Sequence, residues 1–316
     1  MGTTKHFRHL WTAVEPRLLP YTEIDKIRWD AAVLAARNTA VYGMSWYLDA
    51  CFPGWCGLVY GDYEQVMCVP LRRKWGISYA YQPLFVQQSG IFSRVALTAG
   101  DVSRFLRFLD KKVGGVRLYL TPECTGKTSG FDTETRYSQY VSLVPSLDEI
   151  RKKYSENARR NIKKAAKNGL SLQFAGTPGS VVEAFGNQPG EHVERIGEAG
   201  FQRLARLLHR LQEHTDCLVP QVRDTEGRLL YTAFFSVSGG RALYVKGAGT
   251  EQAKNTGAGH FLMDAMIEQY RSAGCTVFDF GGAHAGNVRA FNRQFGADEF
   301  EYLCFNGGYL PSFLRK

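Results

Sequence analysis

The sequence lacks the features of membrane and secreted proteins. No apolar run approaches the about 18 residues that a transmembrane helix needs. The first ten residues are followed by Trp11 and by the charged, proline-broken stretch 15–17, so the hydrophobic core of a signal peptide is absent. A myristoylation signal is absent too, because His6 stands where Ser or Thr is required. We therefore expect a protein without a membrane span that works in the cytoplasm.

The seven cysteines form no metal-binding or disulfide pattern. They are odd in number and scattered, no C-x-x-C pair occurs, and none stands at zinc-ligand spacing from a histidine. Most lie in apolar, strand-like segments such as 66–69 and 275–278. Such cysteines are typical of buried thiols in a reducing compartment. The sequence predicts no metal site.

The sequence does have an ordinary globular composition with an excess of positive charge. Its 316 residues are 44% hydrophobic and 13% aromatic, enough for roughly two domains of about 150 residues. Thirty-nine Lys and Arg against thirty Asp and Glu give a net charge of +9. Segment 151–167 holds eight basic residues and one acid, so it carries seven of these nine charges. The positive charge is therefore concentrated in one segment.

This basic segment has the signals of an amphipathic helix. Ser146 and Glu149 form a capping box at its start. At about 100° per residue, the apolar residues fall on one face and every basic residue except Arg151 falls on the other. The pattern predicts one helix over 146–167. Its cationic face is either a solvated surface or a groove for a polyanion such as the phosphates of a nucleotide or RNA.

The chain divides into two α/β halves at Pro145. The second half is predicted to contain the basic helix, a strand, two helices, three strands (218–223, 229–237 and 241–246), a Gly-rich loop, and then helix, strand, short helix and strand. The first half shares this order loosely. We predict a mixed sheet with flanking helices, arranged as two tandem domains over 1–145 and 146–316, with the Gly-rich loop at 247–259.

Four glycines stand close together in this loop, at positions 247, 249, 257 and 259. Glycine permits left-handed backbone and close approach, so several N–H groups can converge on one anion at the start of the next helix. The segment is not a Walker loop, and no third glycine completes G-x-G-x-x-G. From these residues alone, a pyrophosphate-binding loop and a plain flexible connection both fit.

Several short segments together resemble a known group of transferases. Segment 254–259, Lys-Asn-Thr-Gly-Ala-Gly, resembles the [RQ]-x-x-G-x-[GA] pyrophosphate loop of GNAT acyltransferases, with Lys in the first position. Segment 154–165 is similar to the helix that opens the second domain of Fem-type transferases, which are tandem-GNAT proteins that add amino acids to peptidoglycan precursors. Four further segments fit the same group and its acyl-CoA-using relatives, the last two more weakly: 279–282, 290–296, 45–49 and 81–83.

Two features depart from the Fem-type pattern. Many Fem-type enzymes have Phe-Lys where this chain has Phe291-Asn292. Some also carry a long helical hairpin, which the Gly- and Pro-bearing stretch 176–200 cannot form. Both departures favour an acyl-CoA donor over an aminoacyl-tRNA.

The resemblance implies acyl transfer from a thioester or an aminoacyl ester to an amine. Such a reaction needs a backbone N–H at the donor carbonyl, a positioned amine and proton transfer. The proton-transfer candidates are Asp279, His284, and Tyr244 or Tyr302. The candidates for binding the donor are Val245, Gly247, Lys254, Asn255, Thr256, Gly257, Ala258 and Gly259. Those for substrate phosphates or the acceptor are Lys246, Arg159, Arg160 and Arg289.

Each candidate has a structural alternative. Asp279 is placed to cap the turn that follows it, and His284 is in a loop where histidines are ordinary. The tyrosines fit a hydrophobic core, and the cations fit a solvated surface.

Three hypotheses follow. The first is an N-acyltransferase that uses acyl-CoA and a small-molecule or cell-wall-precursor amine, with 1–145 on the acceptor side and 146–316 on the donor side. The second is a Fem-type aminoacyltransferase that takes aminoacyl-tRNA to a peptidoglycan precursor. The third is a non-catalytic tandem-GNAT scaffold that binds an anionic partner. We prefer the first.

Overall fold

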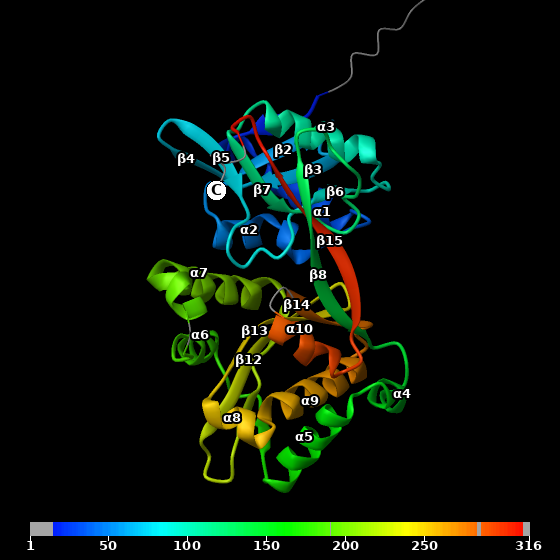
Figure 1. The fold of residues 1–316 in the computed structure, drawn as a ribbon, viewed down its shortest axis with the longest axis vertical. Coiled ribbons are helices and arrows are strands. Elements are labelled where there is room, and N and C mark those ends of the chain that lie inside the picture. Colours follow the sequence, from blue (N-terminus) through cyan, green and yellow to red (C-terminus); the bar gives the residue numbers. More distant parts are fainter. Residues whose placement is uncertain (1–14, 190, 283–285, 312–316) are drawn as a thin grey trace, which may run out of the picture.

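Two lobes joined by long strands make up the structure (Figure 1). The computed structural model describes residues 15–189, 191–282 and 286–311. The first half of the chain contributes β1 (Arg17–Leu19), η1 (Tyr21–Glu23), α1 (Lys26–Leu34), η2 (Val41–Gly43), α2 (Ser45–Cys51), β2 (Cys56–Tyr60), β3 (Gln65–Val69), β4 (Leu71–Lys74), β5 (Ile77–Tyr81), β6 (Ile91–Ser93), α3 (Ala99–Asp110), β7 (Gly115–Tyr119) and β8 (Asp132–Ser142). The second half contributes α4 (Leu147–Lys152), α5 (Glu156–Lys167), β9 (Ser171–Gln173), α6 (Pro178–Gly186), α7 (Glu191–His214), β10 (Asp216–Leu218), β11 (Gln221–Arg223), β12 (Leu229–Ser238), β13 (Arg241–Gly249), α8 (Glu251–Thr256), α9 (Ala258–Ser272), β14 (Val277–Gly282), α10 (Gly286–Arg293) and β15 (Asp298–Gly307).

A single mixed sheet runs through both lobes. Its strands are ordered β4-β5-β7-β15-β8-β14-β13-β12-β11-β9, with β10 paired to β12. The last strand, β15, lies between β7 and β8, and β8 continues into the second lobe to pair with β14 (Figure 1). The first lobe also holds a smaller sheet ordered β1-β2-β3-β6. The predicted mixed α/β architecture is confirmed, and β8 and β15 connect its two parts.

The basic segment forms two helices and not the single one expected over 146–167. The predicted capping box is present in α4, where the Glu149 N–H donates to Ser146 Oγ and the Glu149 carboxylate accepts from the Ser146 N–H. A second cap then restarts the helix, because Ser155 Oγ accepts the N–H of Ala158 at 3.1 Å. A serine cap stabilises a helix start by about 1 kcal/mol. The break therefore follows from Ser155.

Two other expected boundaries in the second half are also wrong. β13 continues to Gly249 because its last residues pair with the start of β12. The expected loop over 247–259 is therefore a strand end, the short helix α8 and a left-handed residue, Gly257. The strand expected over 218–223 divides into β10 and β11 because Pro220 has no N–H to offer the ladder.

Three hydrophobic clusters fill the structure. One lies beneath α3 in the first lobe, and one lies between α5, α9 and the sheet in the second. The third spans both lobes and joins Trp29 and Tyr47 to Phe185 and Leu207. In Figure 1, α2 of the first lobe faces α7 of the second, and there the ring of Trp46 stacks on His214 at 4.4 Å. The two lobes therefore share a core as well as a sheet.

The cysteine thiols are unpaired in the structure. All seven cysteines lie within the described residues and are free thiols. Burial raises the pKa of thiols such as Cys68, which keeps them protonated. Among the described helices, none is at once long and apolar enough to cross a membrane.

Candidate active site

The large sheet opens where β13 and β14 separate. These parallel strands are in register only from Arg241 to Leu243, opposite Val277 to Asp279. On the other edge of β13, Phe235 pairs with Tyr244 and Phe234 with Lys246, so Val245 is an extra residue without a register partner. This is a β-bulge, a feature that frees a peptide group from the ladder and is common beside active sites.

The bulge lies in the wall of a cavity between the lobes. The cavity has a volume of about 340 Å³. Both halves of the chain line it, with Tyr42, Tyr47, Gln82, Pro83, Leu84, Phe85, Val86, Gln87, Tyr119, Arg136, Leu243, Tyr244, Val245, Gly281, Gly282 and Tyr302. Among these described residues, Arg136 is the one with a formal charge, and none is acidic. A concave, mostly aromatic site with few polar groups is the usual form of a small-molecule pocket.

A chain of hydrogen bonds fixes the cavity wall across both lobes. The Tyr42 hydroxyl donates to Gln87 Oε1 at 2.7 Å, and Gln87 Nε2 donates to Ser138 Oγ at 2.7 Å. Ser138 Oγ in turn donates to the carbonyl of Gly281 at 2.8 Å. The loop before β6, strand β8 and the end of β14 are therefore held in one arrangement.

The two candidate tyrosines both line the cavity. The Tyr244 hydroxyl lies 3.0 Å from that of Tyr231. Burial raises the pKa of Tyr244 well above its ordinary value and that of Tyr302 to about 12. Both phenols are therefore protonated near neutral pH and can act as proton donors. The Tyr244 ring also explains Gly247, because a Cβ at that position would collide with its hydroxyl.

Asp279 is buried beside the cavity and is not among its described lining residues. One carboxylate oxygen accepts from Arg241 Nη1 at 2.8 Å, and the other accepts the N–H of Gly281 at 2.9 Å. Burial raises the pKa of Asp279, and the Arg241 guanidinium opposes this shift. By accepting the Gly281 N–H, Asp279 caps the turn that follows it. His284 lies outside the described residues, but Gly282, two positions before it, lines the cavity.

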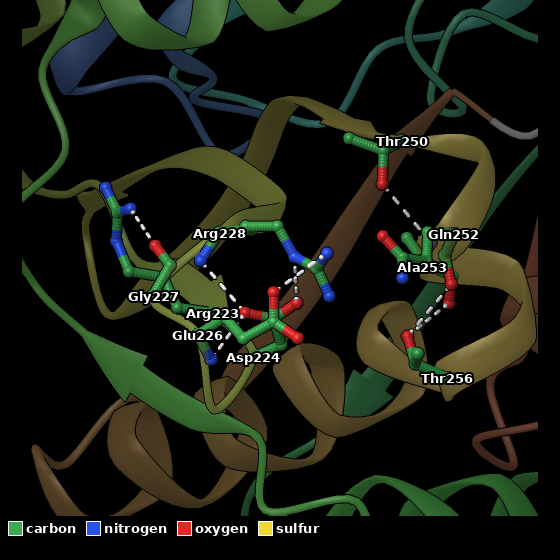
Figure 2. A network of polar contacts seen from close by, with 9 residues as sticks. All are labelled: Arg223, Asp224, Glu226, Gly227, Arg228, Thr250, Gln252, Ala253 and Thr256. Carbon is green, nitrogen blue, oxygen red and sulfur yellow. Dashed lines mark hydrogen bonds and ion pairs between the residues drawn. The ribbon is translucent and has the colours of Figure 1, made fainter.

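The predicted pyrophosphate segment forms a helix–glycine–helix junction. Figure 2 shows the side-chain hydrogen bonds at the two ends of α8. Thr250 Oγ1 accepts the N–H of Ala253 at 3.3 Å, and the Thr256 hydroxyl donates to the carbonyl of Gln252 at 3.1 Å. Gly257 then takes a left-handed conformation (φ 80°) and begins α9, which no side chain caps. The first N–H groups of α9 are therefore left for another acceptor.

The neighbouring turn is also rigid. Figure 2 shows Asp224 between β11 and β12, where its carboxylate accepts from the Arg228 side chain at 2.7 Å and from the Glu226 and Arg228 N–H groups. The N–H of Thr250, the N-cap of α8, donates to the carbonyl of Leu230 near the start of β12. This hydrogen bond attaches the start of α8 to the sheet.

Helix α5 packs directly against this junction. A Cβ at Gly257 would collide with the backbone carbonyl of Asn161. The close approach is possible because the buried residues of α5 are small, Ala158 and Ala165. Arg159 donates to the Lys152 carbonyl at 2.7 Å, so its head group turns back to α4. Helix α5, which carries Arg160 and three lysines, therefore contacts the start of α9 through the backbone of Asn161.

The four candidate phosphate or acceptor cations are not gathered in one place. Arg160 extends along α5 and donates to Asn157 Oδ1 at 2.8 Å. Arg289 pairs with Glu299, and Lys246 lies over the Phe185 ring. None of these three cations is among the described lining residues of the cavity, and neither is Arg159.

The cavity also contains residues that the sequence did not single out. Arg136 comes from β8, and Gln82 and Gln87 come from the segment between β5 and β6. One signal was present, because the segment 81–83 that weakly resembles Fem-type proteins reaches this cavity. No group of three His, Cys, Asp or Glu side chains that could hold a metal ion occurs among the described residues.

Comparison with known proteins agrees with this geometry. Residues 152–295 match the family model of the acetyltransferase (GNAT) domain. No curated protein matches the sequence. Similar solved structures include FemX (13% identity, TM-score 0.64, covering 94% of this chain and 98% of that one) and L-PGS from Bacillus licheniformis (12%, 0.56, 92% and 94%). A tandem GNAT protein from the clavulanic acid biosynthesis pathway is also similar (10%, 0.57, 94% and 100%).

The fold and the domain match together define a class. Residues 152–295 match a GNAT acetyltransferase domain, which supports an acyltransferase. This domain lies in the second half of the chain, and over nearly its whole length the chain has the fold of FemX and of a tandem GNAT protein. The two acyltransferase hypotheses are therefore preferred to a non-catalytic scaffold.

Proposed function

We propose that this protein moves an acyl group from an acyl-CoA to an amine acceptor in the cavity between its lobes. The observation that carries the proposal is the bulge at Val245, where β13 and β14 separate in the cavity wall. A peptide N–H outside the ladder is a donor for a carbonyl oxygen that gains negative charge during acyl transfer. The aromatic lining limits water and strengthens such an interaction.

The α8–α9 junction fits the pyrophosphate of CoA. The uncapped start of α9 offers the backbone N–H groups of Ala258 and Gly259, and the helix dipole favours an anion there. The Gly257 N–H already donates to the Ala253 carbonyl, so Gly257 contributes by its left-handed turn. Lys254, in the last turn of α8, adds a positive charge. Asn255 would contribute through its side-chain amide, whereas the Thr256 hydroxyl is already bonded within α8.

The chain's own residues can manage the protons of the reaction. CoA supplies the thioester that activates the acyl group. As the acceptor nitrogen bonds to the carbonyl carbon and the carbon–sulfur bond breaks, we infer that Tyr244 protonates the departing thiolate. Its raised pKa keeps it protonated until then. The proton released by the new amide then restores the Tyr244 hydroxyl.

Asp279 and His284 take different parts in this proposal. Asp279 is a positioning residue, because it binds the Gly281 N–H and Arg241 and thereby sets the end of β14. We propose His284 as the base that takes one proton from the acceptor's ammonium group before the attack and passes it to solvent, so that the proton lost later, as the amide forms, is the one that restores Tyr244. Gly282, two positions before His284 in the sequence, lines the cavity.

The acceptor is proposed to enter from the side of the first lobe, which supplies Tyr42, Tyr47 and the segment around Gln87. A small-molecule amine or an amine of a cell-wall precursor is the expected class. Both are substrates for a cytoplasmic enzyme, a location that the seven free thiols favour.

One observation favours a second function, aminoacyl transfer from tRNA to a cell-wall precursor. Helix α5 carries a row of basic residues and contacts Gly257 at Asn161, so an RNA backbone bound along α5 would lead to the same junction. In this case Arg160 and the lysines of α5 would hold phosphates.

Binding measurements separate the two. Thermal-shift titrations with acetyl-CoA, a longer acyl-CoA, a UDP-sugar and tRNA should show stabilisation by a CoA ester. We expect Lys254→Glu to weaken CoA binding about 10-fold, and the matched reversal Lys164→Glu on α5 to leave it unchanged. If no CoA ester stabilises the protein and tRNA binds in a manner sensitive to Lys164→Glu, the second function replaces the first.

A further inference from the structure

Arg136 has the features of a binding residue that lacks its ligand. The residue is 7% exposed and lines the cavity. Its Nε–H finds no acceptor among the described residues. Six other buried polar atoms share this condition, but none of them belongs to a described lining residue. A buried N–H of a charged group left without an acceptor is costly, and such groups are retained where a ligand satisfies them.

The surroundings of Arg136 hold the guanidinium in place without neutralising the site. The guanidinium carbon, Cζ, lies 4.1 Å from the centroid of the Tyr119 ring. Nη2 donates to Glu134 Oε1 at 3.2 Å, but Glu134 is shared, because Arg117 donates to its other oxygen at 2.9 Å. Two guanidinium groups therefore face one carboxylate, which leaves one positive charge in excess. A single ligand carboxylate balances that charge.

The same cavity contains the proposed reaction centre. Val245 and Arg136 both line a space of about 340 Å³ in which no described residue is acidic. A cationic ligand group would find no carboxylate partner there. An acceptor that presents its neutral amine at the bulge and a negative group at Arg136 uses both polar ends of an otherwise aromatic site.

We propose that Arg136 binds a carboxylate of the acceptor, and that the acceptor is therefore an amino carboxylic acid. This inference rests on the proposed acyl transfer, because the amine end is placed by the bulge at Val245. Tyr302, whose register partner across the sheet is Arg136, is the neighbouring lining residue that offers a hydroxyl to the same group. A planar guanidinium suits a carboxylate because two N–H groups can reach its two oxygens.

The test is direct binding measured by calorimetry on the full chain. The probes are L-alanine, L-leucine, L-phenylalanine and L-lysine, the carboxamide of each, and inorganic phosphate. We expect at least one acid to bind at least about 10-fold more tightly than its carboxamide. Arg136→Gln should remove this preference, and Arg136→Lys should restore part of it. The matched control is Arg117→Gln, which removes the other partner of Glu134 and should keep the preference.

Several results would overturn the proposal. These are equal binding of acids and carboxamides, no binding of any acid, a preference for phosphate over every acid, or an undiminished preference in Arg136→Gln. Acetyl-CoA binding is measured on the same samples, and Arg136→Gln should leave it intact, which also shows that the variant is folded. If CoA binds and the acids do not, this inference fails alone. If acids bind through Arg136 and no CoA ester binds, the proposed donor fails and the carboxylate site stands.

Discussion

Lys246 is a partly buried cation that packs on an aromatic ring. Its Nζ lies 3.5 Å from the centroid of the Phe185 ring, and burial lowers its pKa from 10.5 to about 8. No carboxylate among the described residues pairs with it. We expect Lys246→Met to raise the free energy of unfolding at pH 7 by about 1–3 kcal/mol, because burying the charge costs more than its contact with the ring returns.

The pH dependence identifies the cause. A base whose pKa is lowered by folding destabilises the folded state while it is protonated, so the penalty is full below pH 8. It shrinks as pH rises through about 8 towards 10.5. Denaturant unfolding at pH 7 and pH 9.5 should therefore show a smaller gain for Lys246→Met at the higher pH. An equal gain at both values would mean that packing and not charge is responsible.

Tyr244 and Tyr231 form a matched pair for testing the proton donor. Their hydroxyls touch each other, so Tyr244→Phe and Tyr231→Phe remove the same hydrogen bond. Each should lower the free energy of unfolding by about 1 kcal/mol. Only Tyr244→Phe should lower kcat strongly, by about 100-fold. Similar losses of kcat in both variants would show that the pair acts by packing.

The proposed donor side of the site is easier to recognise in the sequence than the rest of the cavity. Residues from Tyr244 to Gly259 are continuous in the chain, so their glycines and polarity can be recognised together. Arg136 and Gln87 come from separate segments and meet only because β8 and the segment before β6 fold against the end of β14. A single arginine in a strand carries no signal of burial in the sequence.

At the scale of elements, Gly257 couples three helices. It ends α8, starts α9 and touches the Asn161 carbonyl of α5. We expect Gly257→Ala to lower the free energy of unfolding by roughly 2–4 kcal/mol, because alanine is strained at φ 80° and its Cβ displaces α5. A bulky residue at this position would therefore disturb the fold as well as ligand binding.

Gly274 is the control for this substitution. It has nearly the same backbone angle, φ 82°, but nothing lies within 4 Å of its Cβ position. Gly274→Ala should cost only about 1 kcal/mol, the strain of the left-handed conformation. The difference between the two variants in urea unfolding measures the contact with α5. Equal losses would argue against that contact.

The elements also show what local sequence can and cannot decide. The cap at Ser146 and the helix that begins at Ala258 were predictable, because caps and apolar periodicity act within a few residues. The extension of β13 to Gly249 was not, because it depends on pairing with β12. The four glycines suggested a loop, but Gly247 and Gly249 belong to β13 because they pair with β12.

At the scale of the molecule, the two lobes are built to unfold together. Strand β15 pairs with β7 and β8, and one hydrophobic cluster contains residues of both lobes. Cutting the chain at Pro145 would separate β8 from β14 and β15 and α2 from α7. A division of roles between acceptor and donor halves is therefore compatible with one cooperative structure.

The tryptophans make this cooperativity measurable. Four of the five, Trp29, Trp46, Trp55 and Trp75, lie in the described part of the first lobe, and Trp11 lies outside the described residues. Tryptophan fluorescence therefore chiefly reports the first lobe, whereas far-UV circular dichroism is dominated by helices α5, α7 and α9 of the second. We expect both signals to give one thermal midpoint. Trp46→Phe, which trims the ring stacked on His214 between the lobes, should lower both midpoints by the same amount. Midpoints that separate by more than about 5 °C, beyond what a 1 kcal/mol change produces, would show that the lobes unfold independently and that the shared sheet does not couple them.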